Sequence, residues 1–438
     1  MHLHKPLSRR PKLPGPRGHW LLGALPRLRT DMLGFFEECF REHGDAAYFR
    51  VASRHSMLLS HPDDIERVDD WQRLPFLTKD ELRDAYPYGL ACGGPYVRIH
   101  MSSGTTGHPI LNPYTVNDVA QWGEVMARSY VAAGVTRSDV IQITPSFGLF
   151  TGGFGFHYGA ERLGAMVIPT GAGRTSLQLT LMRDLRATVV TAIATYPLRL
   201  IEVARAEQVD LGALALRVGI FGSEMWSDDL RARIDRELGI RSHDIIGMTE
   251  TGGPGLGIDC EARAGIHVWE DHYHAEIVDP RTGSAVADGG EGELVLSTLT
   301  REGLPLIRYR THDLTRVVSR ARCACGRTAL RLDRLRGRTD DMVIYKGVNF
   351  YPRQIETVVL RQPGVSHEYQ VRLDSEGGGE RMTLVIETET GCDPGVAARI
   401  RRELHDLLAL SPEVELCAVG TIERPQGKAV RVIDRRAQ

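Results

Sequence analysis

Short apolar runs alternate with amphipathic stretches along this chain from about residue 68 onward. Four such runs are DVIQITP, GAMVIPT, ATVVTAIA and LRVGIFG. Ahead of the first run, VNDVAQWGEVMARSYVAAG has apolar residues at helical spacing. Apolar runs of this length between helices indicate strands buried on both faces of a parallel sheet, because the helices cover those faces. The pattern therefore predicts an α/β fold.

Two further patterns follow along the chain. Residues 256–336 are typical of strands and turns, and HAEIVDPRTGSAVADGGEGELVLSTL predicts two strands around a Gly/Asp-rich turn. The last hundred residues combine a strand, RMTLVIETE, with an amphipathic helix, PGVAARIRRELHDLLAL. The charged stretch RGRTDD lies between the two patterns and is predicted to be a hinge. We therefore expect a large α/β domain with a β-rich portion at 68–336 and a smaller, mobile α+β domain at 337–438.

Residues 1–67 have a different character. A proline-rich lead-in is followed by DMLGFFEECFREHG, which has helical spacing, and by AAYFRVASRHSMLLS, which alternates like a hairpin. The apolar run WLLGAL is too short and too closely flanked by proline for a signal peptide, so we expect a cytoplasmic protein.

Composition excludes several classes of protein. The 438 residues are enough for two or three domains, and 42% are apolar and 25% charged, as in ordinary globular proteins. A net charge of −2 argues against nucleic-acid binding. No apolar run reaches the roughly 18 residues that a membrane span needs. The seven cysteines of a cytosolic chain are expected to be reduced, so a cysteine cluster indicates a metal site or core packing.

The stretch MSSGTTGHP, at Met101–Pro109, follows the strand-like YVRIH. Glycines let a ligand approach the backbone closely, and the hydroxyl groups add donors beside the backbone N–H groups. Such a loop binds phosphates in some proteins and is an ordinary turn in others, so both interpretations stay open. The stretch lacks the lysine of P-loop NTPases, which argues against that class.

Three other polar stretches each have a functional and a structural interpretation. Glu250 follows an apolar strand, where a carboxylate can hold Mg²⁺ or be a solvated loop residue. Asp313 can accept hydrogen bonds from ribose hydroxyls or form an ion pair with Arg308 or Arg310. Lys428, on a proline–glycine loop, can contact a phosphate or carboxylate, or be an ordinary surface lysine.

Taken in order, these stretches resemble the phenylacetate–coenzyme A ligases. These enzymes are a branch of the adenylate-forming superfamily, which also includes acyl-CoA synthetases, luciferases and peptide-synthetase adenylation domains. The resemblance covers nearly all of residues 68–436. It is carried by ten blocks, among them LPFLTKDELRDAYPYGL, HMSSGTTGHP, IFGSEMW, GMTETGGPG, LPLIRYRTHDL, GRTDDMVIYKGVNFYPRQIE and RPQGKAVRVIDRR.

The resemblance implies a reaction in two steps. A carboxylate attacks the α-phosphorus of ATP and releases pyrophosphate, and a thiol then attacks the acyl-adenylate after the small domain has rotated. Catalysis of the first step is mainly positioning and charge stabilisation. The implied cofactors and co-substrates are ATP, Mg²⁺ and coenzyme A, and the implied acid is an aryl acid.

Site residues follow from the resemblance position by position. The catalytic group comprises Lys428, which would bridge the carboxylate and the α-phosphate, together with Thr249 and Glu250, whose carboxylate would hold Mg²⁺. Asp340 falls on the hinge. The ATP-binding residues would be Ser102, Ser103, Gly104, Thr105, Thr106, Gly107, Ser223, Glu224, Asp313 and Arg338.

Aromatic residues in two stretches match segments that line the acyl pocket. These residues can stack on a ring or be packing residues. Ile246 and Phe147 stand where the family usually has tyrosine, which indicates an acid other than phenylacetate, such as an amino- or hydroxy-substituted benzoate or cinnamate. The pocket residues are expected to be Phe147, Phe150, Phe154, Phe156 and Gly222.

Three cysteines and a histidine form a further candidate set. C-x6-H and C-x-C are the two halves of a tetrahedral Zn²⁺ site, a pattern that the resemblance also supports. The alternative is four uncoordinated side chains. The set is Cys260, His267, Cys323 and Cys325, while Cys39, Cys92, Cys392 and Cys417 lack partner spacing and are expected in the core.

The chain departs from the family at its start. Residues 1–67 resemble the opening of a haem-thiolate mono-oxygenase, although no haem-binding cysteine motif follows. We expect an aryl acid–CoA ligase that acts on small molecules without a nucleic-acid or membrane partner. Two alternatives stay open: an adenylating enzyme of a natural-product pathway, which passes the acyl group to a carrier-protein thiol or another nucleophile, and an inactive nucleotide-binding protein. Whether the chain forms a homodimer is also open.

Overall fold

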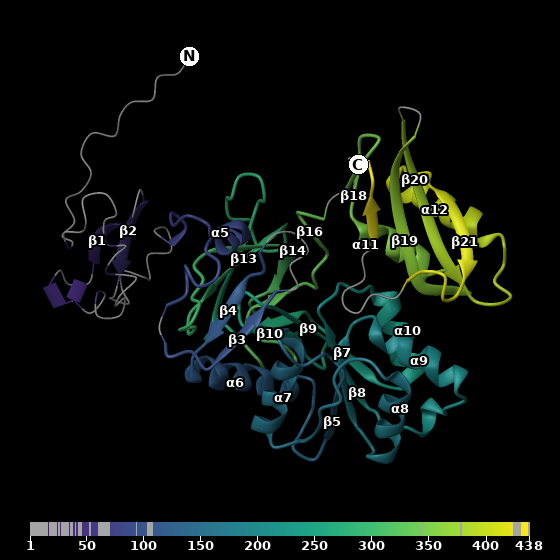
Figure 1. Ribbon diagram of the computed structural model, residues 1–438, viewed down its shortest axis with the longest axis horizontal. Coiled ribbons are helices and arrows are strands. Elements are labelled where there is room, and N and C mark those ends of the chain that lie inside the picture. The colour runs from purple at the N-terminus through teal and green to yellow at the C-terminus, as the bar shows by residue number, and fades with distance from the viewer. Residues whose placement is uncertain are drawn as a thin grey trace.

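The computed structural model describes residues 71–92, 94–102, 108–341, 343–376, 379–423 and 431–436. It also describes the antiparallel hairpin of β1 (Ala46–Val51) and β2 (Arg54–Leu59), and isolated positions between residues 16 and 42. The hairpin confirms the alternation seen in that stretch of the sequence. Figure 1 shows a large α/β body and a smaller C-terminal unit beside it.

A 12-stranded sheet forms the centre of the large body. The four apolar runs of the sequence are strands in its parallel part, which confirms the predicted parallel sheet. The strands of this part pair in the order β9-β8-β7-β5-β6. They are β5 (Val140–Ile143), β6 (Met166–Ile168), β7 (Val189–Ile193), β8 (Val218–Gly222) and β9 (Arg241–Met248).

Helices cover both faces of these strands, because alternate strand residues point to opposite sides. On β7, Val189 packs in a core with Trp122 and Met126, whereas Val190 packs in a second core with Leu198 and other helical residues. The first core contains residues of α6 (Val116–Ala132) and α7 (Gly152–Leu163). The second contains residues of α8 (Thr175–Asp184), α9 (Tyr196–Ala206) and α10 (Asp228–Leu238), and a short 3₁₀ helix spans Leu211–Ala213.

The rest of the sheet is antiparallel and continues from β9. The Gly/Asp-rich turn joins two paired strands, as predicted. The antiparallel strands are β10 (Gly253–Asp259), β11 (Ile266–Val268), β12 (Tyr273–Val278), β13 (Glu291–Thr298), β14 (Tyr309–Ser319), β15 (Arg331–Leu332) and β16 (Gly337–Arg338).

A separate hairpin and a short helix complete the large body. The hairpin consists of β3 (Arg98–Met101) and β4 (Leu111–Tyr114), and the helix is α5 (Lys79–Asp84). Thr78 begins α5 with a capping box, because its hydroxyl accepts from the Glu81 N–H while the Glu81 side chain accepts from the Thr78 N–H. A small apolar core that includes Leu82 of α5 ties the helix to β14.

The C-terminal unit is an α+β domain around a four-stranded sheet of order β21-β20-β19-β22. Its core is separate from the two cores of the large body. The fold class is therefore the predicted one. The elements are β17 (Val343–Tyr345), β18 (Val348–Phe350), α11 (Pro352–Leu360), β19 (Val365–Glu376), β20 (Gly379–Thr388), α12 (Val396–Leu408), β21 (Glu413–Ala418) and β22 (Val432–Asp434).

The expectation that four cysteines lie in the core is confirmed for Cys39, which is buried, and wrong for Cys92 and Cys417, which are only partly buried. Cys392 is also only partly buried, but it packs against the core of the C-terminal unit. Cys392 lies in a surface turn beside Gly364, and Cys417 lies on β21, an edge strand of the small sheet. Among the residues that the structure describes, no helix is long and apolar enough to span a membrane.

Candidate active site and metal cluster

The site lies at the carboxyl ends of three neighbouring parallel strands. In register, Ile193 of β7 pairs with Gly222 of β8, and Gly222 pairs with Ile245 of β9. The residues that follow these strand ends therefore share one edge of the sheet, where open α/β sheets bind their ligands. They include Thr195, Glu224 and Glu250, of which the sequence analysis had singled out the two glutamates.

Glu250 sits in a tight turn directly after β9. The Gly252 N–H donates to the Thr249 carbonyl over 3.2 Å, which closes the turn. The Glu250 residue is only 5% exposed, and Lys79 Nζ of α5 lies 3.3 Å from its Oε1. Burial and the negative charge of the nearby Glu250 raise the pKa of Tyr309 well above its usual value, so the Tyr309 hydroxyl beside the carboxylate stays protonated. The carboxylate is therefore paired with a cation and lies near a protonated hydroxyl group.

Lys79 was missed by the sequence analysis. It lies in the TKDEL stretch, which belongs to one of the blocks that carry the family resemblance. An available signal was the capping box of α5, which places the next residue, Lys79, in the first helical turn.

The glycine-rich loop joins β3 to β4, and the hairpin brings its two ends together. The Ser102 N–H donates to the Ile110 carbonyl over 3.0 Å, and Ser102 Oγ accepts from the Ile110 N–H over 3.0 Å. Ser103, Gly104, Thr105, Thr106 and Gly107 lie outside the described residues. His108, just after the loop, stacks on Tyr86 with ring centroids 4.7 Å apart.

Asp313 and Arg338 are paired across strands β14 and β16. Arg338 Nη1 donates to Asp313 Oδ1 over 2.9 Å, and the same guanidinium binds Asp340 through two bonds of 2.8 Å. Burial alone would lower the pKa of Arg338, but the bonds to Asp340 and the charge of Asp313 raise it. One arginine thus connects the predicted ribose aspartate to the predicted hinge aspartate.

The local ion pairs that the sequence offered for Asp313 are not the ones formed. Arg308 instead bonds Glu276 over 3.0 Å, and Arg310 pairs with Glu293. The reason is strand geometry, because Arg310 meets Glu293 on the neighbouring strand β13 and Arg308 reaches Glu276 on β12, while Asp313 is in register with Arg338 of β16.

The loop after β8 has a strained backbone. Ser223 has φ of +68°, a conformation that non-glycine residues rarely adopt. The preceding residue, Gly222, packs closely on β9, since a Cβ there would lie 2.2 Å from the Ile245 carbonyl oxygen. The Thr195 hydroxyl donates to Glu224 over 2.7 Å and links this loop to the end of β7.

The predicted pocket phenylalanines differ in their surroundings. Phe147 and Phe154 are partly buried and pack edge to face, with ring centroids 5.3 Å apart. Phe156 is buried against Tyr130 in the core, and Phe150 is 45% exposed. Phe147 and Phe154 are therefore the pair that the fold places together.

Arginines of both domains meet at Trp226, just beyond the Ser223–Glu224 loop. Arg334 and Arg353 donate to the Trp226 carbonyl over 2.6 and 3.1 Å, and Arg353 belongs to the small domain. Glu356 of the small domain lies near Glu224 of the large domain. Burial and the charge of Glu224 raise the pKa of Glu356 to about 6, although the charge of Arg431 acts to lower it. The small domain thus contacts the large one beside the candidate site. Lys428 itself lies outside the described residues.

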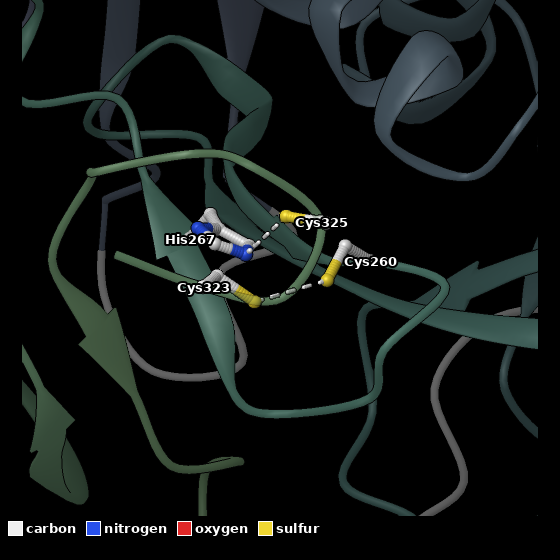
Figure 2. Close-up of side chains that lie close together, drawn as sticks. All are labelled: Cys260, His267, Cys323 and Cys325. Atoms are coloured by element: carbon white, nitrogen blue, oxygen red, sulfur yellow. Dashed lines mark hydrogen bonds between the residues drawn. The ribbon is translucent and has the colours of Figure 1, made fainter. Parts of the chain in front are cut away.

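The three cysteines and the histidine form a compact cluster at the other end of β10 and β11. Figure 2 shows the four side chains pointing toward one another, and their ligand atoms all lie within 4.8 Å. Sγ of Cys260 is 3.8 Å from Sγ of Cys323, and Sγ of Cys325 is 3.5 Å from Nε2 of His267. Burial lowers the pKa of His267 to about 4, so the imidazole is neutral and can be a ligand.

Comparisons with known proteins agree with this arrangement. Residues 96–300 match the family model described as AMP-binding enzyme, and residues 347–436 match AMP-binding enzyme C-terminal domain. The fold and the site thus define a member of the adenylate-forming enzymes.

Sequence relatives identify the family within this class of enzymes. The chain is 41% identical over 387 residues to phenylacetate-coenzyme A ligase of Pseudomonas putida, covering 86% of this chain and 87% of that enzyme. The enzyme of the same description from Escherichia coli is also 41% identical, over 389 residues. The chain belongs to the phenylacetate–coenzyme A ligase family and is an ATP-dependent, AMP-forming acid–CoA ligase.

Solved structures indicate which domain arrangement the chain adopts. 2-Hydroxyisobutyryl-CoA ligase in its postadenylation state superposes with a TM-score of 0.79 at 26% identity, over 86% of this chain and 83% of that chain. The same enzyme in its thioesterification state superposes over the same shares of both chains with a TM-score of only 0.62. The domains of the present chain are therefore arranged much as in the postadenylation state.

Proposed function

We propose that this ligase activates a substituted aryl acid and that the strand-end edge around Glu250 is its adenylation site. The observation that carries the proposal is that Glu250, Glu224 and the hairpin of the glycine-rich loop lie at one edge of the sheet, while the Asp313–Arg338 pair lies near Tyr309, a neighbour of Glu250. These groups come from different parts of the chain. Together they supply the carboxylates, the cation and the glycine-rich backbone that binding of a nucleotide requires.

The charge at Glu250 supports binding of Mg²⁺ with ATP. The carboxylate is buried and pairs with one cation, Lys79, whose place Mg²⁺ would take. Bound here, Mg²⁺ would neutralise charge that grows on the phosphate oxygens. Asp313 would accept hydrogen bonds from the ribose hydroxyls, and Arg338 would hold Asp313 in orientation. Ser223 and Glu224 would line the nucleotide from the end of β8.

The aryl preference is supported by Phe147 and by Phe154 of α7, whose aromatic rings pack edge to face. A screen of aryl acids by ATP-dependent pyrophosphate release, with and without coenzyme A, tests this assignment. Substituted benzoates or cinnamates are expected to exceed short aliphatic acids, and a preference for aliphatic acids would contradict it. Thioester formation with free coenzyme A distinguishes this acceptor from a carrier-protein thiol.

Lys428 is proposed to bridge the attacking carboxylate and the α-phosphate, on the strength of the sequence resemblance. A point charge there serves only adenylation, so Lys428→Ala is expected to abolish pyrophosphate release. The variant should still convert a supplied acyl-adenylate and coenzyme A to the thioester. Equal loss of both steps would contradict this role.

The Cys260 cluster is proposed to hold a structural Zn²⁺. In a tetrahedron with Zn–S bonds of about 2.3 Å, two sulfur atoms lie about 3.8 Å apart, and the observed Cys260–Cys323 separation is 3.8 Å. With four protein ligands the site is closed, which is typical of structural rather than catalytic zinc. Metal analysis of the purified protein is expected to find about one zinc per chain.

A further inference from the structure

The Glu250 turn is anchored by Asn112, a residue of β4. Asn112 is fully buried, and its Nδ2 donates to the Thr249 carbonyl over 2.5 Å and to the Glu250 carbonyl over 3.2 Å. Because β4 is the strand that leaves the glycine-rich loop, one amide joins the two chain segments proposed to hold the triphosphate and its metal. These segments are 137 residues apart in the sequence.

Arg301 fixes the orientation of this amide. Its Nη2 donates to Asn112 Oδ1 over 2.7 Å and to the Pro113 carbonyl over 3.3 Å. A guanidinium can only donate and the two turn carbonyls can only accept. The amide oxygen must therefore face Arg301, and the NH₂ group must face the Glu250 turn.

Arg301 is itself held in place by the side chains of Tyr114 and Asp118. The guanidinium lies over the Tyr114 ring at 4.2 Å, and its Nη1 is 3.7 Å from Asp118 Oδ1. Asp118 also accepts from the N–H groups of Glu302 and Gly303, each over 2.9 Å, and so fixes the turn that carries Arg301. Arg301 also lies directly against the Glu250 turn. The guanidinium is so close to Gly252 of this turn that a Cβ added to the glycine would lie only 3.3 Å from Nη1.

We infer that Asn112 and Arg301 are positioning residues for metal-bound ATP. They act through the backbone of the Thr249–Glu250 turn and set where the Glu250 carboxylate points relative to β4. Neither side chain needs to touch the nucleotide. The inference rests on the proposed role of Glu250. Removal of groups that orient a metal ligand typically costs about 10- to 100-fold in metal affinity.

Binding of Mn²⁺ in the presence of a non-hydrolysable ATP analogue tests the inference without turnover, through the loss of the electron paramagnetic resonance signal of free Mn²⁺. Asn112→Ala removes the donor. Asn112→Asp keeps the partner of Arg301 but turns a second acceptor toward the two carbonyls. Both variants are expected to weaken Mn²⁺ binding about 10-fold or more. Asn117→Ala is the matched control, because Asn117 donates to the Glu302 side chain over 2.8 Å at an exposed position and does not touch the Thr249–Glu250 turn.

Steady-state kinetics add a readout that general loss of structure would not produce. The Mg²⁺ concentration needed for half-maximal pyrophosphate release should rise in both Asn112 variants, while KM for the acid should stay within about twofold. Arg301→Lys should recover part of the metal affinity that Arg301→Met loses, because lysine can still donate to Asn112 Oδ1.

Glu250→Gln separates the two possible failures. If it weakens Mn²⁺ binding while both Asn112 variants bind Mn²⁺ like the unchanged protein, the positioning role is overturned and the metal role of Glu250 stands. If Glu250→Gln itself leaves Mn²⁺ binding unchanged, the metal role is wrong and the inference that depends on it is overturned too.

Discussion

The two candidate metal sites differ in what their ligand atoms contact. In the Cys260 cluster the ligand atoms face one another, at 3.8 Å between two sulfurs and 3.5 Å between a sulfur and the imidazole. At the candidate nucleotide site the Glu250 carboxylate instead contacts Lys79 at 3.3 Å and lies near the Tyr309 hydroxyl. The first set is arranged around a central position, whereas the second has a protein cation as its partner.

This difference indicates that one metal would be a permanent part of the fold and the other would bind only with the substrate. A closed set of four soft ligands is suited to a metal that stays bound and contributes to folding. A single carboxylate with a replaceable lysine partner is suited to a metal that arrives with the substrate, since Mg²⁺ in such sites keeps waters and binds the phosphates. Variants of each site should therefore affect different properties of the protein.

The largest effect is expected from Cys260→Ser. Structural zinc contributes on the order of 10 kcal/mol to the folding of small zinc domains, so the loss of one thiolate should remove the metal and strongly lower the melting temperature. Metal analysis and thermal unfolding of the same sample measure both. Cys392→Ser, at a partly buried surface turn, is the control and should keep its zinc and its melting temperature. An unchanged melting temperature in Cys260→Ser would contradict a structural role of the Cys260 cluster, which would then not differ from the Glu250 site in its contribution to folding.

The second-largest effect is expected from Glu250→Gln, on the rate of adenylation. Removing the charge that would hold Mg²⁺ should slow acid-dependent pyrophosphate release about 100-fold or more, as loss of a charge-stabilising group does in other enzymes. The zinc content should not change. Glu261→Gln, at an exposed position, serves as the control. A variant that loses less than about threefold in rate would contradict the nucleotide-site role of Glu250.

The smallest effect is expected from Lys79→Met. The Lys79 side chain is 28% exposed, so its ion pair with Glu250 should contribute only about 1 kcal/mol to the stability of the metal-free protein. Mg²⁺ without ATP should then raise the melting temperature of the variant more than that of the unchanged protein, because lysine no longer competes for the carboxylate. Arg83→Met removes an exposed pair with Asp80 from the same helix and is the matched control. An equal response to Mg²⁺ in all three proteins would show that Lys79 does not compete with the metal.

Local patterns in the sequence were sufficient for the strands and for several site candidates. The apolar runs predict β5 to β8 because a strand buried on both faces must be apolar along its whole length. The Thr249–Glu250 pair could be placed after a strand, and the Cys and His spacing could be recognised as a metal set. Their roles needed the family resemblance, since a lone carboxylate or a C-x-C pair occurs in many structural contexts.

Partners between distant segments could not be predicted in the same way. The sequence offered Arg308 and Arg310 for Asp313, but strand register pairs Asp313 with Arg338. Asn112 and Arg301 carry no motif of their own, and the capping box at Lys79 does not reveal its partner. Lys79 and Asn112 precede Glu250 by 171 and 138 positions, and Arg301 follows Gly252 by 49 positions. Nothing in the local chemistry of an asparagine in LNPY points to a turn after β9.

The sequence by itself determined the α/β class, the reaction class through its ordered blocks, and the residue types available to bind nucleotide and metal. The tertiary structure alone decided which of these side chains meet, how deeply each is buried and which cation faces Glu250. The physical reason is that apolar periodicity is a local property of the chain. Hydrogen bonds and ion pairs between segments instead depend on strand register and helix packing, which the whole fold fixes together.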